Sequence, residues 1–186
     1  SESENLKERY KELSVVDELT GLYNRRFFFP EAQAILTRAM RYEQSFSIMV
    51  IDVDHFKEVN DSYGHMAGDY VLEDLSRLLA KQVRDADILC RFGGEEFMML
   101  LPDTDEKGCM ELAEKVRKSM ENTQFQTPQG PLKKTLSVGV ALFPGDGGGF
   151  WNIVKQADLA LYQAKEQGRN RTLMYNTSMQ GETPES

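Results

Sequence analysis

Cysteine, tryptophan and histidine are scarce in this chain of 186 residues, which holds two cysteines, one tryptophan and two histidines. The spacing of Cys90 and Cys109 fits neither a zinc site nor a disulfide framework, so we expect two buried thiols in a reducing cytoplasm. No apolar run long enough to span a bilayer occurs, and there is no signal-peptide pattern. We therefore expect a soluble cytoplasmic domain without membrane contact of its own. An anchor in a missing N-terminal part of the full-length protein stays open.

Basic residues are outnumbered, because 22 Lys and Arg face 30 Asp and Glu, which gives a formal charge of −8. Non-specific binding to nucleic acid or to an anionic membrane needs a basic face, so we expect neither partner. A small anion is compatible with this charge if a few cations cluster locally. The 40% hydrophobic and 28% charged fractions are typical of a globular protein, and the length favours one domain with a sizeable core.

The two ends of the chain differ from its centre. Residues 1–14 are polar, and their few apolar residues have the spacing of a short amphipathic helix or coiled coil: Leu6, Tyr10 and Leu13. Because the first residue is not Met, we expect a piece of a longer protein, in which residues 1–14 end a signalling helix or coiled-coil linker. Residues 15–175 are predicted to form the domain, and the polar residues 176–186 a disordered tail.

Nearly continuous apolar runs predict strands, and apolar residues every three or four positions predict helices. The predicted strands are 47–53, 87–90, 98–101, 135–143 and 171–175. Helices are predicted to start at Pro30, near Ala67 and after a cap at Asp105, and to cover 150–167, with a loop at 60–65 and a surface loop or hairpin over 123–134. This order predicts an α+β domain with a central mixed or antiparallel sheet of about five strands covered by helices.

Residues 91–97, with the sequence Arg-Phe-Gly-Gly-Glu-Glu-Phe, lie between two predicted strands and predict a β-hairpin with its tip at Gly93 and Gly94. Glycines permit positive φ at such a tip and let a ligand come close to the backbone. The adjacent carboxylates of Glu95 and Glu96 repel each other unless cations share them, which favours a metal site. A solvated acidic turn is the alternative.

Two further carboxylates, Asp52 and Asp54, stand at the end of the predicted strand 47–53. Carboxylates at the end of a buried strand are costly to desolvate and usually mark a site at the edge of the sheet. For Asp52 the alternative is a strand-end cap without any ligand.

Further motifs occur in order along residues 15–175. They are Asp17-x-Leu-Thr-Gly-Leu-x-Asn-Arg-Arg26, Asp52-x-Asp-His-Phe-Lys-x-x-Asn-Asp61, Gly64-His-x-x-Gly-Asp69, Ser137-x-Gly139 and Asp158-x-Ala-Leu-Tyr-x-Ala-Lys-x-x-Gly-Arg-Asn170. In these motifs and in the hairpin, the chain resembles a GGDEF domain of the diguanylate cyclase family, in its Gly-Gly-Glu-Glu-Phe variant. The resemblance implies a fold like the palm of class III nucleotidyl cyclases and polymerases, which is ferredoxin-like. It also implies an enzyme that condenses two GTP into cyclic di-GMP with release of two pyrophosphates.

The resemblance assigns metal binding to the side chains of Asp52, Glu95 and Glu96 and to the Val53 carbonyl. We expect two Mg²⁺ in each active site, with Mn²⁺ as an alternative, because these ions prefer hard oxygen ligands. Glu95 is also the candidate general base, and Lys57 the candidate cation that stabilises the transition state.

GTP binding is assigned by the same resemblance. Backbone N–H groups at residues 55–57 are expected to cradle the triphosphate, while Lys165 and Arg169, four residues apart on one helix, hold its terminal phosphates. Guanine recognition is expected from Asn60 and Asp69, which argues against ATP as a substrate. The full set is His55, Phe56, Lys57, Asn60, His65, Asp69, Gly93, Gly94, Lys165 and Arg169. The alternatives are a solvated helix face for Lys165 and Arg169, a helix cap for Asp69 and a structural role for His65.

An Arg-x-x-Asp motif, Arg84 to Asp87, stands at the family's spacing before the hairpin and implies an inhibitory site for the product. An arginine can stack on guanine while the aspartate accepts from its Watson–Crick edge. Arg117, with Lys115 as the alternative, is expected to complete this site.

The product contains two nucleotides, whereas one such domain holds one GTP. The resemblance therefore implies a homodimer with two sites that face each other across a two-fold axis, controlled by an upstream sensor domain in the intact protein. The alternative function is a catalytically silent module that senses GTP or cyclic di-GMP and signals through a protein partner.

Overall fold

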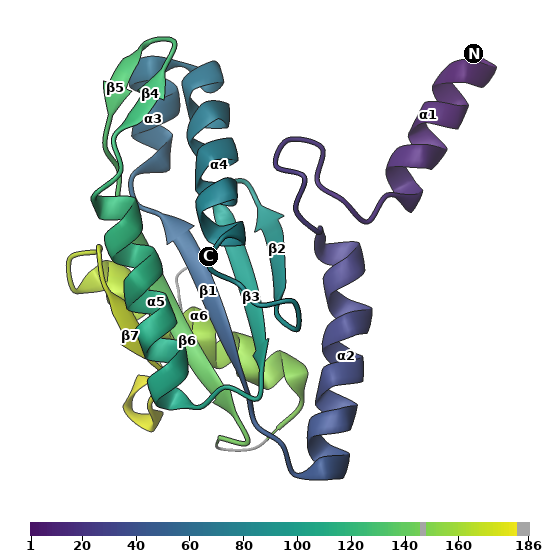
Figure 1. Ribbon diagram of the computed structural model, residues 1–186, viewed down its shortest axis with the longest axis vertical. Coiled ribbons are helices and arrows are strands. Elements are labelled where there is room, and N and C mark those ends of the chain that lie inside the picture. Colours follow the sequence, from purple (N-terminus) through teal and green to yellow (C-terminus); the bar gives the residue numbers. More distant parts are fainter. Residues whose placement is uncertain (146–147, 182–186) are drawn as a thin grey trace.

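The structure, a computed structural model, describes residues 1–145 and 148–181. A five-stranded sheet has the order β2-β3-β1-β6-β7 (Figure 1). Its strands are β1 (Phe46–Val53), β2 (Ile88–Gly93), β3 (Glu96–Pro102), β6 (Leu136–Phe143) and β7 (Thr172–Met174). Neighbours pair antiparallel except β6 and β7, which are parallel, so the prediction of a mixed α+β sheet of about five strands is confirmed.

Helices cover both faces of this sheet (Figure 1). The α-helices are α1 (Glu2–Leu13), α2 (Arg25–Tyr42), α3 (Phe56–Tyr63), α4 (His65–Ala80), α5 (Glu106–Glu121) and α6 (Phe150–Glu166). The predicted surface hairpin over 123–134 is confirmed as β4 (Phe125–Thr127) and β5 (Gly130–Leu132). No helix in the described ranges is long and apolar enough to cross a bilayer.

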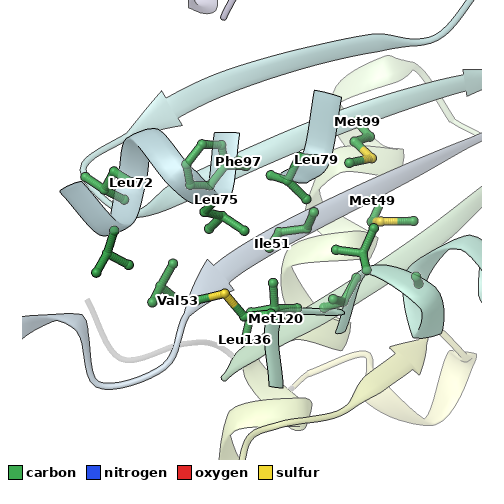
Figure 2. Packing of buried hydrophobic residues seen from close by; sticks show 14 of the residues in the cluster. Met49, Ile51, Val53, Leu72, Leu75, Leu79, Phe97, Met99, Met120 and Leu136 are labelled. Atoms are coloured by element: carbon green, nitrogen blue, oxygen red, sulfur yellow. The ribbon is translucent and has the colours of Figure 1, made fainter. Parts of the chain in front are cut away.

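The central strand β1 is buried on both faces, which explains its nearly continuous apolar sequence. Met49, Ile51 and Val53 pack under α4 and α5 (Figure 2). The alternate residues Ile48 and Val50 pack under α2 and α6. Asp52 has the same parity as Ile48 and Val50, so it lies on the α2/α6 face at the end of the strand where the apolar core stops.

Three predicted boundaries are wrong. Helix α2 begins at Arg25, with Pro30 inside it, because the Asn24 side chain caps it by accepting from the Phe27 N–H at 3.3 Å. The predicted loop at 60–65 is mostly helical, since Gly64, with φ of 87°, is enough to separate α3 from α4. The predicted disordered tail instead continues with a 3₁₀ helix, Thr177–Met179, in which Met179 is buried, while 182–186 lie outside the described residues.

Helix α1 contributes no buried residue and extends away from the sheet (Figure 1). The side chains of Leu6, Tyr10 and Leu13 are 58%, 72% and 77% exposed. The amphipathic helix predicted from their spacing is therefore present, with its apolar side chains exposed. The coiled coil stays a prediction.

Helix α6 crosses β6 at Gly139, and the two backbones are in close contact there. A Cβ added to Gly139 would lie 2.1 Å from the Ala157 carbonyl oxygen and 2.3 Å from the Leu161 nitrogen. We predict that Gly139→Ala lowers the free energy of unfolding by about 1–3 kcal/mol or more, since backbone atoms cannot yield as a side chain does. Urea denaturation checks this. Gly94→Ala, whose Cβ meets nothing within 4 Å, is the control, and equal stability of both variants would contradict the prediction.

Candidate active site

The carboxylates predicted to bind metal meet at one end of the sheet. Asp52 in β1 lies directly opposite Glu96 in β3, so both side chains are on the same face. The Val53 N–H donates to the Glu95 carbonyl at 3.3 Å, which holds the hairpin turn against the end of β1. The structure thus brings Asp52, Val53, Glu95 and Glu96 together. They converge from strands that are 43 residues apart between Val53 and Glu96 along the chain.

The hairpin itself is confirmed, with one correction to its tip. Gly93 pairs with Glu96, so the two turn residues are Gly94 and Glu95 rather than the two glycines. Neither glycine has a positive φ. The space beside both glycines is open to an approaching ligand, because a Cβ added to either one would meet nothing within 4 Å.

Burial and like charge work against ionisation of this cluster. Burial raises the pKa of Asp52, although its ion pair with Lys165 opposes the effect. Burial, followed by the charges of Asp158 and Asp52, raises the pKa of Glu96 to about 6. The pKa of Asp158 in α6 is raised by burial as well. Three carboxyl groups therefore share a partly desolvated region with one close cation, Lys165.

The chemistry of these donors fits a divalent cation. Asp52 Oδ1 is buried without a hydrogen-bond partner, while Oδ2 is held by the Lys165 ammonium. A carboxylate oxygen buried without a donor needs an explanation, and a bound cation supplies one. In residues 1–145 and 148–181, however, no three His, Cys, Asp or Glu side chains are arranged as a ready-made metal centre. A cation would therefore bind carboxylate oxygens, of which one, on Asp52, is now paired with the Lys165 ammonium.

Asp54 is a buried anchor whose role sequence reasoning missed. Its carboxylate accepts from Thr135 Oγ1 at 2.6 Å, Ser137 Oγ at 2.7 Å and the Asn170 N–H at 3.0 Å. These bonds tie the end of β1 to β6 and to the turn that carries Arg169, whose φ is 63°. The signal in the sequence was the second carboxylate of the Asp-x-Asp pair together with Ser137.

The N-terminus of α3 presents the backbone predicted to cradle phosphate. His55 has φ of 54° and precedes the helix, so the first N–H groups of α3 have no partner within the helix. Phe56 is buried and fixes this end, whereas the His55 and Lys57 side chains are exposed.

The residues predicted to recognise guanine lie where α3 and α4 pack together. A Cβ added to Gly68 would lie 2.1 Å from Asn60 Oδ1, so the Asn60 side chain rests against α4 next to Asp69. Asp69 is exposed and lies within α4, whose N-cap is Gly64, so its alternative role as a helix cap is wrong. His65, the first residue of α4, is exposed too.

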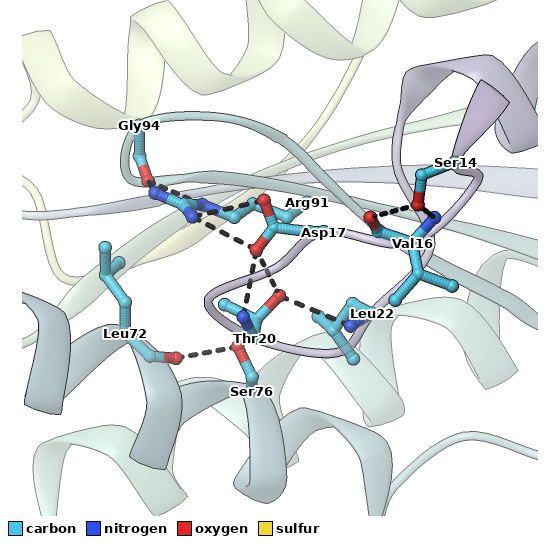
Figure 3. A network of polar contacts seen from close by, with 9 residues as sticks. All are labelled: Ser14, Val16, Asp17, Thr20, Leu22, Leu72, Ser76, Arg91 and Gly94. Carbon is cyan, nitrogen blue, oxygen red and sulfur yellow. Dashed lines mark hydrogen bonds and ion pairs between the residues drawn. The ribbon is translucent and has the colours of Figure 1, made fainter. Parts of the chain in front are cut away.

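Arg91 links the hairpin turn at Gly94 to Asp17 (Figure 3). Its guanidinium donates to the Gly94 carbonyl at 3.0 and 2.8 Å and to Asp17 at 3.1 Å. Asp17 also accepts from the Thr20 N–H at 2.9 Å and the Thr20 hydroxyl at 2.7 Å. Although burial raises the pKa of Asp17, these bonds outweigh it and lower the pKa overall. The motif at Asp17 therefore positions the hairpin turn across 74 residues of sequence.

Arg84 and Asp87 of the Arg-x-x-Asp motif form an ion pair with each other. Arg84 Nη2 lies 2.8 Å from Asp87 Oδ1, and it also donates to the Pro102 carbonyl at 2.8 Å and the Thr104 hydroxyl at 2.9 Å. The Asp87 side chain is 1% exposed and that of Arg84 is 57% exposed. Both line a depression of about 610 Å³ beside the start of α5.

Arg117 does not belong to this depression. Arg117 forms ion pairs with Glu114 and Glu121 and donates a hydrogen bond to Asn170, each at 2.9 Å. Its guanidinium therefore lies on the side of α5 away from the depression. Leu112 lines the depression, and Lys115, one turn further along the helix, lies exposed on that same face. Arg117 therefore does not reach the depression that holds Arg84 and Asp87, and of the two residues expected to complete an inhibitory site only the alternative, Lys115, lies on that face.

The link between Arg91 and Asp17 gives a pH-dependent prediction. We expect Asp17→Asn to lower the free energy of unfolding by about 1.5–3 kcal/mol at neutral pH, as for hydrogen bonds to a charged group. Because folding lowers the pKa of Asp17 below its ordinary 3.8, this contribution is full above that value and is lost as the pH falls through the folded value. Urea denaturation from about pH 7 to pH 3 checks this, and a stability gap independent of pH would contradict it.

Comparison with known proteins gives one consistent result. A family model described as "Diguanylate cyclase, GGDEF domain" matches residues 14–171. The response regulator PleD of Caulobacter vibrioides is 40% identical over 161 residues, covering 86% of this chain and 36% of that protein. Diguanylate cyclase A of Treponema denticola is 35% identical over 171 residues, covering 90% of this chain and 46% of that protein. The chain thus spans less than half the length of these relatives.

Solved structures agree with this result. The coiled coil and GGDEF domain of DgcB from Caulobacter crescentus, in complex with c-di-GMP, superposes with a TM-score of 0.83 at 27% identity and covers 93% of each chain. A GGDEF-domain structure of PA1120 from Pseudomonas aeruginosa has a TM-score of 0.84 at 32% identity, with 88% of this chain and 96% of that chain covered. The motifs, the carboxylate site and these matches together show that the chain belongs to the GGDEF family of diguanylate cyclase domains.

Proposed function

We propose that this domain is an active diguanylate cyclase that joins two GTP into cyclic di-GMP and two pyrophosphates. The observation that carries the proposal is the pairing of Asp52 with Glu96 beside the Glu95 turn, with one Asp52 oxygen buried and unpaired. Such a cluster is costly to desolvate, and the ion pair of Asp52 with Lys165 compensates only part of that cost. The names of the relatives, among them Diguanylate cyclase A, support the same activity.

Each linkage forms by attack of the 3′-oxygen of one GTP on the α-phosphorus of the other. The new O3′–P bond forms as the bond from the α-phosphorus to the β-phosphate oxygen breaks, and pyrophosphate leaves with that electron pair. The 3′-hydroxyl proton passes to Glu95 as general base. Two Mg²⁺ ions held by Asp52, Glu95, Glu96 and the Val53 carbonyl, or Mn²⁺ in their place, would lower the pKa of the hydroxyl and neutralise phosphate charge.

Charge on the triphosphate is neutralised by groups from two elements. The first N–H groups of α3 at residues 55–57 and the exposed Lys57 ammonium approach it from one side. Lys165 approaches it from the last turn of α6. Arg169 lies beyond the end of that helix, with φ of 63°, so the expectation that the two residues share one helix face is wrong. Lys165 now pairs with Asp52, so substrate and metal would release it towards the phosphates.

Guanine selection rests on Asn60 and Asp69, which lie side by side at the α3–α4 contact, with His65 nearby at the start of α4. A carboxylate that accepts from guanine N1–H and N2–H₂ cannot make these bonds to adenine. The open backbone at Gly93 and Gly94 lets the nucleotide approach the hairpin.

The proposed enzyme acts as a homodimer, because one domain offers one such site and the product needs two nucleotides. The exposed apolar residues of α1 would pair two copies in the intact protein under control of an upstream sensor domain. Cyclic di-GMP would inhibit by binding at Arg84, Asp87 and Lys115. The DgcB structures in complex with c-di-GMP show that a relative binds this ligand.

Removing the general base should lower turnover by orders of magnitude without unfolding the domain. We predict that Glu95→Gln lowers turnover of GTP by on the order of 10²–10⁴-fold, with unchanged thermal unfolding. Chromatography of the nucleotides after incubation with GTP and Mg²⁺ checks this. Glu31→Gln, an exposed carboxylate of α2, is the matched control. Cyclic di-GMP synthesis by the Glu95→Gln protein at the rate of the unaltered protein would remove Glu95 from the mechanism.

Product inhibition has its own test at Arg84. We predict that Arg84→Ala weakens binding of cyclic di-GMP at least about tenfold, because stacking and charged hydrogen bonds are lost together. Thr104→Val removes one loop contact of Arg84 but keeps the guanidinium, so it controls for disturbance of the loop. Calorimetric titration measures both. Equal product affinity of the Arg84→Ala and unaltered proteins would refute the inhibitory site.

A further inference from the structure

A recess of about 670 Å³ opens beside the hairpin, at the edge strand β2. Four basic residues line it, and they come from three parts of the chain: Lys11, Arg25, Arg26 and Arg91. Asp17 is the one acidic residue among its lining residues. This concentration of positive charge stands out in a chain whose acidic residues outnumber its basic residues by 30 to 22. It is the local cluster of cations that a small anion requires.

Most of this positive charge is not neutralised within the described residues. Asp17 is used by Arg91, at 3.1 Å. Arg25 donates through Nε to the Phe92 carbonyl at 2.9 Å and lies 3.9 Å above the Phe92 ring, so its terminal nitrogens stay available. Arg26 reaches only the Lys11 carbonyl, at 3.3 Å, and the Lys11 ammonium has no ion pair in the described ranges. The side chains of Lys11, Arg25 and Arg26 therefore have donor groups available for a bound anion.

The backbone of the recess suits phosphate oxygens. Gly93 and Gly94 form part of its wall, and a Cβ added to either would meet no atom within 4 Å. An open glycine backbone beside cationic side chains is the usual setting for a phosphate group, which needs close donors and compensating charge.

The recess is separate from the cations assigned to the domain's own GTP. In the sheet order, β2 lies three strands from β6, or about 14 Å at 4.8 Å per strand. The Lys165 ammonium pairs with Asp52 in β1, two strands from β2, and Arg169 follows the end of α6, which packs on β6. Asp52 in β1 and Glu96 in β3 lie between β2 and β6 in the sheet order, so the carboxylates separate the recess from the β6 side of the sheet.

We propose that this recess binds phosphate groups of the GTP held by a second copy of the chain, so that each copy supplies cations to both substrates of the productive dimer. The inference rests on the proposed function and deepens it. The reacting carboxylates of one copy must meet the α-phosphate of the other nucleotide, and the recess adjoins those carboxylates on the side away from the copy's own triphosphate.

The test uses the double variant Lys11→Gln with Arg26→Gln, which leaves the Arg25 and Arg91 contacts to the hairpin in place. We expect a GTP analogue with a methylene group between its α- and β-phosphates to bind a dilute copy with unchanged affinity. Turnover at saturating GTP should fall at least about tenfold, which corresponds to the loss of one charged contact. Arg38→Gln, an exposed arginine further along α2, should change neither quantity.

Mixing experiments show which copy the recess serves. The Glu95→Gln protein keeps its recess, and the double variant keeps its general base. The recess and the general base that act on one α-phosphate belong to the same copy, and neither copy of the mixed dimer has both. Linear pppGpG should therefore not exceed the sum of the separate proteins, whereas a recess that served its own copy's GTP would give a gain. A gain in the mixture, weaker analogue binding by the double variant, or unchanged turnover would each overturn the inference while the proposed function stands. An unaltered protein without turnover would refute the proposed function and this inference with it.

Discussion

The organisation of the domain depends on carboxylates held at the end of a buried central strand. Apolar residues of β1 pack on both faces of the sheet, and Asp52 follows directly where the α2/α6 core ends. Burial there raises the pKa of both Asp52 and Glu96, so the folded protein retains an electrostatic cost that a cation would relieve. Lys165 relieves part of it, and one Asp52 oxygen remains unpaired.

The surrounding structure fixes this site from two sides. Asp54 satisfies its own buried charge with three donors and so anchors the turn that carries Arg169. On the other side, Arg91 holds the Gly94 carbonyl, and Asp17 holds Arg91. Because the segment at Asp17 follows α1 directly, a movement of that helix would reach the hairpin turn through a short series of charged hydrogen bonds. This gives the N-terminal helix a physical route to the carboxylates at the end of β1.

Much of this arrangement could be predicted from the sequence, and the exceptions have physical causes. The strand at 46–53 and the helix at 150–166 were predictable because continuous burial and helical burial leave distinct apolar patterns. The division between α3 and α4 was missed, since a single glycine makes it. Asp54 and the link between Arg91 and Asp17 join residues more than 70 positions apart, which no local pattern encodes. Arg117 was misplaced because only the helix face decides between it and Lys115.

The measurement that tests this account most directly is the formation of cyclic di-GMP from GTP over a wide range of protein concentrations, with Mg²⁺ and with a chelator. The account predicts product that rises more steeply than in proportion to protein, because two copies must meet, and no product when the chelator removes the cation. Product that stays proportional to protein, or that forms in the chelator, would contradict a cation-dependent reaction between two facing sites.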